Sequence, residues 1–359
     1  MGHISLAMAK PLVFEFFGIF PMSLFRFLAY FFSALLLTIV ISCSDQTPNT
    51  TSQTPASSSA TQISTTMEHG HGGKPKININ SAILSELDKL EAKLGVPALS
   101  NKIQASRPYG KPEELVSKKV VTAEQFDQIK DMVTIEDIKL EGEAKDVDYM
   151  TKLGLMKGHL LVARELLDLQ KPNQAEPHIG HPVEEIYADV EDQLSERKVK
   201  PFKEPLIALQ DEVKAGAKNA SKVNTDFKTS MQSVEAAISA LSESQRKTPN
   251  FVLQVINGLL DTANSEYGAA IANGKVAQII EYQDSRGFVT YANQLYKGIS
   301  DQMAKDHPEA HKSILSTITD LTKAWPSPLA PNTPVLTTAQ VTKLIKMIEQ
   351  TSLNAIKTS

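Results

Sequence analysis

Three of the eight histidines, His159, His178 and His181, fall within one predicted helical hairpin. Pro182 suits the first position of a helix, so His181 marks its N-cap region and Glu185 follows about one turn later on the same face. Imidazole nitrogens and a carboxylate oxygen form a donor set suited to iron, copper or zinc. The sequence therefore predicts a transition-metal site of His159, His178, His181 and Glu185. In the alternative interpretation, His181 only caps its helix and His178 lies in an exposed loop.

A second group with chemical potential comes about a hundred residues later. Glu281 and Asp284 are three residues apart and so share one face of a predicted helix, and Arg286 is close enough to pair with either. The simpler interpretation of these three residues is an ion pair at the surface or between helices.

From residue 138 onward, long amphipathic helices must position these side chains. Apolar residues recur at helical spacing, polar breaks separate the segments, and we find no convincing strands. The predicted helices are Tyr149–Leu169, Pro182–Leu194, Pro201–Lys214, Val223–Leu241, Phe251–Asn273, Val276–Lys305, Glu309–Trp325 and Thr338–Lys357. The Gly158-His159 pair, the His178-x-x-His181-Pro182 unit and the acidic group make residues 156–325 resemble the extracytoplasmic helical domains of bacterial iron-uptake systems. Those domains include EfeO-type proteins and the external segments of iron permeases. The resemblance implies a metal-binding module.

Residues 76–137 differ in their sequence pattern, which predicts four short helices separated by Pro and Gly residues. Ser81 is expected to cap the first helix, and Thr122, with Gln125 three residues later, is expected to form a capping box at the fourth.

The segments Ile-Asn-Ile-Asn-Ser, Gly-Val-Pro-Ala-Leu, Arg-Pro-Tyr and Glu-Glu-Leu-Val of residues 77–135 resemble the tandem helix-hairpin-helix domain of ComEA-type competence proteins and PsbU-like photosystem proteins. In that motif, backbone amides at a helix N-terminus hold a DNA phosphate. The resemblance implies a DNA or protein contact through Gly95, Val96 and Pro97, with the side chains of Lys102 and Arg107. However, Gly95 is the only glycine of the first hairpin, and the second hairpin has none. A protein-docking or purely structural role therefore remains open.

The N-terminal segment is typical of a signal that targets a chain to a membrane. An apolar run from Leu24 to Ile41 ends in Ser42-Cys43, and the lone cysteine resembles the lipidation site of bacterial lipoproteins. The alternative is an uncleaved transmembrane anchor, although its 18 residues are only just enough. Met8 and Met22 are alternative start residues. If translation begins at Met22, residues 1–21 precede the true N-terminus.

We therefore expect an all-α protein in four parts. Residues 1–43 are a signal and lipidation segment, 44–75 a Ser/Thr/Pro-rich linker, 76–137 a helix-hairpin-helix domain and 138–359 an antiparallel helical bundle. The net charge of −4 does not favour nucleic-acid binding by the chain as a whole. No hydrolase motif is present, so we expect a binding protein rather than an enzyme, lipid-anchored outside the cytoplasm. Its ligand is DNA or an extracytoplasmic protein, or alternatively a metal ion in an uptake or sensing system.

Overall fold

Helices dominate the computed structural model, which describes residues 76–137 and 139–357, and the all-α prediction is confirmed. The predicted signal segment, the linker and Cys43 lie outside the described residues. None of the helices within the described ranges is long and apolar enough to span a membrane.

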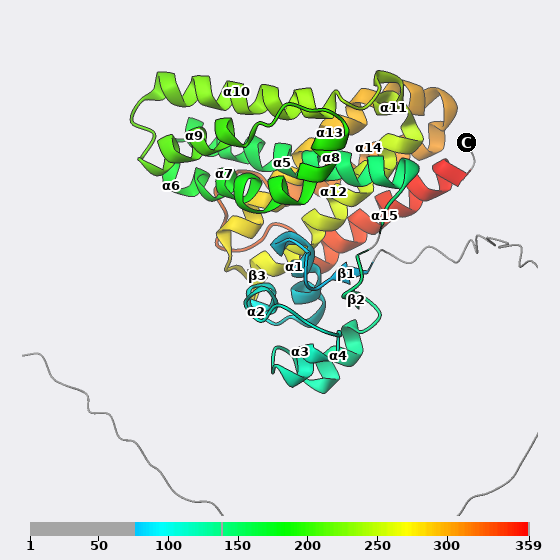
Figure 1. Cartoon of the computed structure of the whole chain (residues 1–359). Helices are drawn as coiled ribbons and strands as arrows, with labels where there is room; N and C mark the ends of the chain where they lie inside the picture. The colour runs from blue at the N-terminus through cyan, green and yellow to red at the C-terminus, as the bar shows by residue number, and fades with distance from the viewer. Residues whose placement is uncertain (1–75, 138, 358–359) are drawn as a thin grey trace, which may run out of the picture. The chain divides into compact units, whose positions relative to one another are not determined.

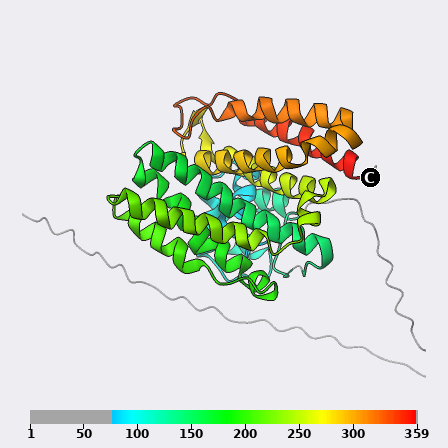
Figure 2. The same cartoon turned by 90° about the horizontal axis from the view of Figure 1, so that it is seen from above.

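The larger part of the structure is a bundle of long helices. The bundle consists of α5 (Gly142–Asp168), α6 (Pro172–Ala175), α7 (Pro177–His181), the π-helical turn η1 (Pro182–Ile186), α8 (Tyr187–Glu196), α9 (Lys203–Lys214), α10 (Ala220–Ile238), α11 (Glu243–Lys247), α12 (Pro249–Ala270), α13 (Ile279–Asp306), α14 (Pro308–Leu321), the 3-10 turn η2 (Thr322–Ala324) and α15 (Thr338–Lys357). Seen from above, the α14–α15 pair lies against the α12–α13 pair, α5 packs on the other side of that pair, and the α9–α10 pair lies beyond α5 (Figure 2). A short antiparallel pair, β3 (Ile271–Ala272) and β4 (Lys275–Val276), joins α12 to α13.

Helices α5 and α13 cross in close contact at a pair of glycines. A Cβ atom on Gly287 would lie 2.3 Å from the carbonyl oxygen of Gly158, and a Cβ on Gly158 would lie 3.0 Å from the carbonyl carbon of Gly287. Only residues without a side chain allow two backbones to approach this closely. The crossing fixes the position of His159, the next residue on α5, relative to the first turns of α13.

The smaller part folds around its own core. Its helices are α1 (Leu84–Leu94), α2 (Leu99–Ala105), α3 (Glu114–Ser117) and α4 (Ala123–Ile129), and β1 (Ile77–Asn78) pairs in parallel with β2 (Val133–Thr134). The predicted capping box is confirmed, since Thr122 and Gln125 cap α4 reciprocally. The predicted cap at Ser81 is wrong: α1 starts after Ile83, and the Ser81 amide instead donates to the Asn78 carbonyl in a turn.

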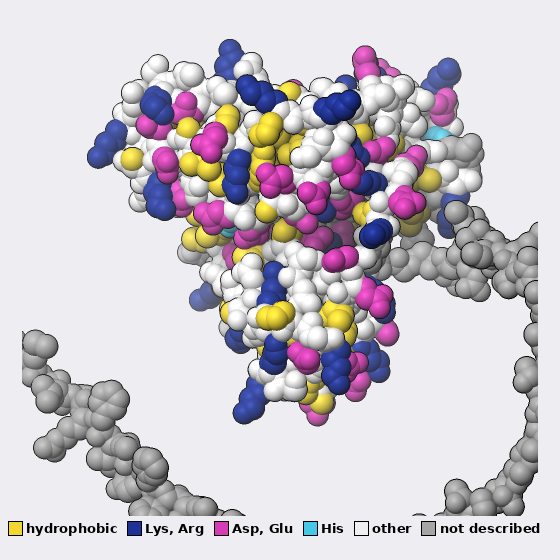
Figure 3. All heavy atoms as spheres, in the orientation of Figure 1, with side chains coloured by type: hydrophobic (Ala, Val, Ile, Leu, Met, Phe, Trp, Pro, Cys, Tyr) yellow, Lys and Arg dark blue, Asp and Glu magenta, His cyan; other side chains and the backbone are white. Residues whose placement is uncertain are grey.

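Helix α1 packs against α12 of the bundle, so the two parts share a boundary (Figure 1). The Lys89 ammonium lies 3.1 Å from the Asp261 carboxylate, and Ile83 is buried in the core of the bundle. A Cβ atom on Gly268 would lie 3.1 Å from the Cβ of Ala92, so small residues face each other at this contact. Acidic side chains gather along the junction of the two parts (Figure 3).

Candidate metal centre

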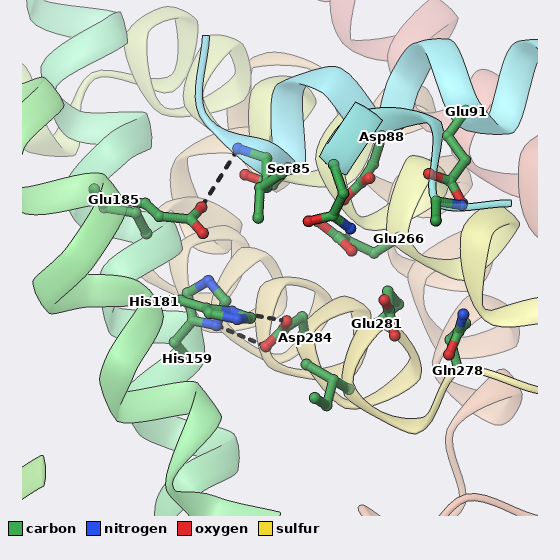
Figure 4. A pocket seen from close by; sticks show the side chains of 15 residues that line it. Ser85, Asp88, Glu91, His159, His181, Glu185, Glu266, Gln278, Glu281 and Asp284 are labelled. Carbon is green, nitrogen blue, oxygen red and sulfur yellow. Dashed lines mark hydrogen bonds and ion pairs between the residues drawn. The ribbon is translucent and has the colours of Figure 1, made fainter. Parts of the chain in front are cut away.

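Three elements that are far apart in the sequence bring His159, His181 and Asp284 together (Figure 4). His159 belongs to α5, His181 ends α7, and Asp284 lies in the second turn of α13. One nitrogen of each histidine and one oxygen of Asp284 all lie within 4.8 Å of one another. Ligands about 2 Å from a metal ion are at most about 4 Å apart, so a small side-chain movement would let all three bind one ion.

His159 is buried, with 3% of its side chain exposed. Its Nδ1 lies 2.6 Å from Asp284 Oδ1, yet it has no aligned hydrogen-bond partner in the described part of the chain. The ring packs edge-on against Phe288, with 4.9 Å between the centroids. A buried polar atom without a hydrogen bond calls for another partner, and a cation shared with the carboxylate is one such partner.

His178 is fully buried, and both of its ring nitrogens are engaged. Its Nδ1 lies 2.6 Å from Asp284 Oδ1, and its Nε2 lies 2.9 Å from Gln283 Oε1. The Gln283 amide group donates to the carbonyl oxygen of Pro328, so its Oε1 faces His178, whose Nε2 must donate. The structure thus places His178, which the sequence predicted as a ligand, in contact with the ligand candidate Asp284. Its position in α7 also excludes the alternative of an exposed loop.

His181 is not a helix cap, because its backbone is helical and α7 continues without a break into η1. The continuation is a π-helical turn at Pro182–Ile186, and such turns are frequent at functional sites. The Nδ1 of His181 lies 3.3 Å from Asp284 Oδ2. The predicted partner Glu185 lies in the π-helical turn, where one of its oxygens accepts a hydrogen bond from the Leu84 amide at 3.4 Å.

The charges of this group are strongly coupled. Burial alone would raise the pKa of Asp284, but the neighbouring rings of His159 and His178 hold that pKa well below its usual range. Burial likewise opposes protonation of His181, yet the hydrogen bond and charge of Asp284 raise its pKa to about 9. For His159, burial prevails and lowers the pKa, so this imidazole is available as a neutral ligand.

The candidate ligands line one wall of a cavity of about 210 Å³ between α1 and the bundle. Six carboxylates line it, and no Lys or Arg side chain does. Four of the carboxylates belong to the bundle, and α1 supplies the other two, so the smaller part of the protein completes the cavity (Figure 4). The acidic residues are Asp88, Glu91, Glu185, Glu266, Glu281 and Asp284.

Most of these carboxyl groups have a raised affinity for protons. Burial raises the pKa of Asp88 to about 7, against the hydrogen bond from Ser100. Burial and the nearby Asp88 carboxylate raise the pKa of Glu266 well above its usual value. Burial also raises the pKa of Glu185 and of Glu281. Enclosed carboxylates in a cavity that no Lys or Arg lines favour any cation that enters it.

The sequence did not reveal the cavity positions of Asp88, Glu91 and Glu266, nor the contact of Asp284 with the histidines. Glu266 falls on the apolar stripe of α12 between Ala263 and Ala270. An acidic residue on a buried apolar stripe is unusual, and this pattern in the sequence could have marked Glu266 as a candidate site residue. Asp284 was grouped with Glu281 and Arg286 on one helix face and not with the histidines. Arg286 does form an ion pair between helices, but its partner is Glu165 of α5, with 2.6 Å between Nε and Oε2. The expected partners Glu281 and Asp284 are therefore wrong, and Asp284 is left to the histidines.

The predicted DNA- or partner-binding residues are arranged differently from a phosphate site. Gly95 ends α1 with a positive φ of 64°, and Val96 and Pro97 follow it in the turn. The amides of Ala98 and Ser100, at the start of α2, donate to the Glu91 carboxylate at 2.9 and 3.3 Å. An internal anion thus already occupies the position of a phosphate.

The two predicted basic contacts also differ from each other. The Arg107 guanidinium donates to the carbonyl oxygens of Ile79, at 2.8 Å, and Ala82, at 2.5 Å, so it ties the turn after α2 to the start of the domain. Lys102 is exposed. Of the two basic side chains predicted to bind DNA, that of Lys102 is exposed, whereas that of Arg107 is partly buried and engaged by backbone carbonyls.

Comparison with known proteins bears on the bundle. Residues 242–359 are similar to the iron permease-associated 4-helix bundle domain. The match covers α11 to α15 and includes Glu266, Glu281 and Asp284, whereas His159 and His181 precede it. No curated protein and no solved structure matches the chain. The resemblance of the helical bundle to iron-uptake proteins is thereby supported, and the comparison gives no support to a helix-hairpin-helix domain.

Proposed function

We propose that this protein binds iron as a module of an uptake or sensing system, with His159, His181 and Asp284 as ligands. The observation that carries the proposal is the convergence of these three side chains from α5, α7 and α13, with ligand atoms within 4.8 Å. Two imidazoles and one carboxylate are a donor set that mononuclear iron(II) sites use, with further positions left open. The similarity of residues 242–359 to an iron permease-associated domain favours iron over copper or zinc.

The role assigned to the protein is binding rather than catalysis, at a membrane surface outside the cytoplasm. The lipid anchor at Cys43 remains a proposal that rests on the sequence. In this proposal the smaller domain is neither a DNA-binding unit nor only a docking unit, because α1 closes the metal cavity with Asp88 and Glu91.

Elemental analysis and anaerobic iron(II) titration of the purified full chain test the proposal. We expect metal in stoichiometric amount, and we expect His181→Ala to weaken iron binding at least tenfold. His181 is 30% exposed, so its removal should leave the fold intact. His311→Ala is the matched control, since this ring stacks on Tyr296, and His311 does not line the cavity. A protein that carries no iron, copper or zinc and takes up none would refute the proposal.

A further inference from the structure

The cavity contains more carboxyl groups than one metal ion at the histidines would bind. Of its six carboxylates, Asp284 contacts the histidines, Glu91 accepts from the amides of Ala98 and Ser100, and Glu185 accepts from the Leu84 amide. Three carboxylates remain, on α1, α12 and α13, namely Asp88, Glu266 and Glu281.

Glu266 is the most informative of the three. Only 3% of its surface is exposed, and it makes no hydrogen bond or ion pair with any residue in the described ranges. Its carboxylate lines the cavity beside Asp88 (Figure 4). A buried carboxylate without a partner costs several kcal/mol, so a position of this kind is retained where a proton or a cation compensates it.

Asp88 and Glu281 approach the same end of the cavity from the other two helices (Figure 4). Asp88 accepts a hydrogen bond from the Ser100 hydroxyl, which holds its side chain in place and leaves further acceptor positions on the carboxylate. Glu281 is half-buried and lies one helical turn before Asp284. The three donors are therefore oxygens only, unlike the nitrogen-rich group around His159.

We propose that the cavity binds a second divalent cation through the carboxylates of Asp88, Glu266 and Glu281, next to the ion at His159, His181 and Asp284. Carboxylate oxygens select hard cations such as Mn²⁺, Mg²⁺ or Ca²⁺. Among the described residues, only the histidine group has three ligand atoms within 4.8 Å, so the second cation reaches part of its ligands through water. A cavity of about 210 Å³ accommodates these waters, since one water needs roughly 10–15 Å³.

The two positions use different ligands. The inference rests on the proposed function for the first ion, but Asp88, Glu266 and Glu281 are not ligands of that ion. It also assigns α1 a specific task, because Asp88 is the contribution of the smaller domain to the second position.

The test is Mn²⁺ stoichiometry, measured by equilibrium dialysis of the full chain in detergent, followed by elemental analysis. We expect two equivalents for the wild type and one for Glu266→Gln, which keeps the size of the side chain and removes its charge. Glu191→Gln, on the exposed side of α8, is the matched control and should retain two. His181→Ala should retain one equivalent, that of the carboxylate position.

The other outcomes show which of the two proposals fails, or that both do. One equivalent in the wild type that Glu266→Gln leaves unchanged would overturn the second position alone, as would two equivalents in both proteins. One equivalent that disappears in Glu266→Gln but persists in His181→Ala would refute the histidine site and keep the carboxylate position. No bound Mn²⁺ in any protein, together with no bound iron, would overturn both.

Discussion

Replacing Gly287 by alanine tests whether the crossing of α5 and α13 builds the metal centre. The new Cβ would lie 2.3 Å from the Gly158 carbonyl oxygen and 2.8 Å from its carbonyl carbon, whereas ordinary contacts begin near 3.4 Å. The atoms in conflict belong to the backbone, so no side chain can rotate away. The two helices must therefore separate by about 1 Å.

The expected magnitude combines two opposing effects. Overpacking of a core costs about 1–3 kcal/mol, and more where the backbone must move, while alanine in a helix gains about 1 kcal/mol over glycine. We expect a net loss of about 2 kcal/mol in the free energy of unfolding, or a fall of about 4–8 °C in Tm. Because His159 follows Gly158 directly, the separation also draws its imidazole away from Asp284, and iron(II) affinity should fall at least tenfold.

Thermal unfolding and anaerobic iron(II) titration measure the two effects. Gly298→Ala is the matched control, since it lies on the same helix and its Cβ would meet no atom within 4 Å. This control should be as stable as the wild type or about 1 kcal/mol more stable, with unchanged iron binding. If Gly287→Ala behaves like Gly298→Ala in both assays, the close crossing does not position the site.

Four further results are expected. Between its unfolded pKa of 3.8 and its folded pKa of about 7, Asp88 binds more protons in the folded metal-free protein, as do the other raised carboxyl groups. The Tm of the metal-free protein should therefore fall from pH 5 to 7. Over the same range the increase in Tm caused by Mn²⁺ should grow, because the metal binds the deprotonated carboxylates. A flat Tm profile in differential scanning fluorimetry would contradict both expectations. Glu91→Ala leaves two amides at the start of α2 without an acceptor and should cost about 1–3 kcal/mol in urea unfolding, and Glu91→Gln, which keeps one acceptor, clearly less. Lys102→Glu should not change DNA retention in a gel shift, and a salt-sensitive loss would restore the DNA hypothesis. Cys43→Ser should move the protein from the membrane to the soluble fraction, and unchanged membrane retention would favour a transmembrane anchor.

Local patterns were sufficient for much of the fold. Apolar spacing predicted the long helices of the bundle, because a helix that packs on a core repeats its buried positions every three or four residues. The capping box of Thr122 was equally readable, since both partners are three residues apart in the chain. The start of α1 was not, because Ser81 and Ala82 lie in a turn closed by the Asn78 carbonyl, and the helix begins at Leu84 without a side-chain cap.

For the candidate site, the sequence itself determined the donor chemistry: histidines close together on one hairpin, and an acidic pair on a later helix. Only the tertiary structure decided which of them meet. The glycine crossing of α5 and α13 brings Asp284 to the histidines, and the docking of α1 encloses the cavity with Asp88. These choices depend on how helices pack across more than a hundred residues of chain, and periodicity reports which face of a helix is buried but not what that face meets.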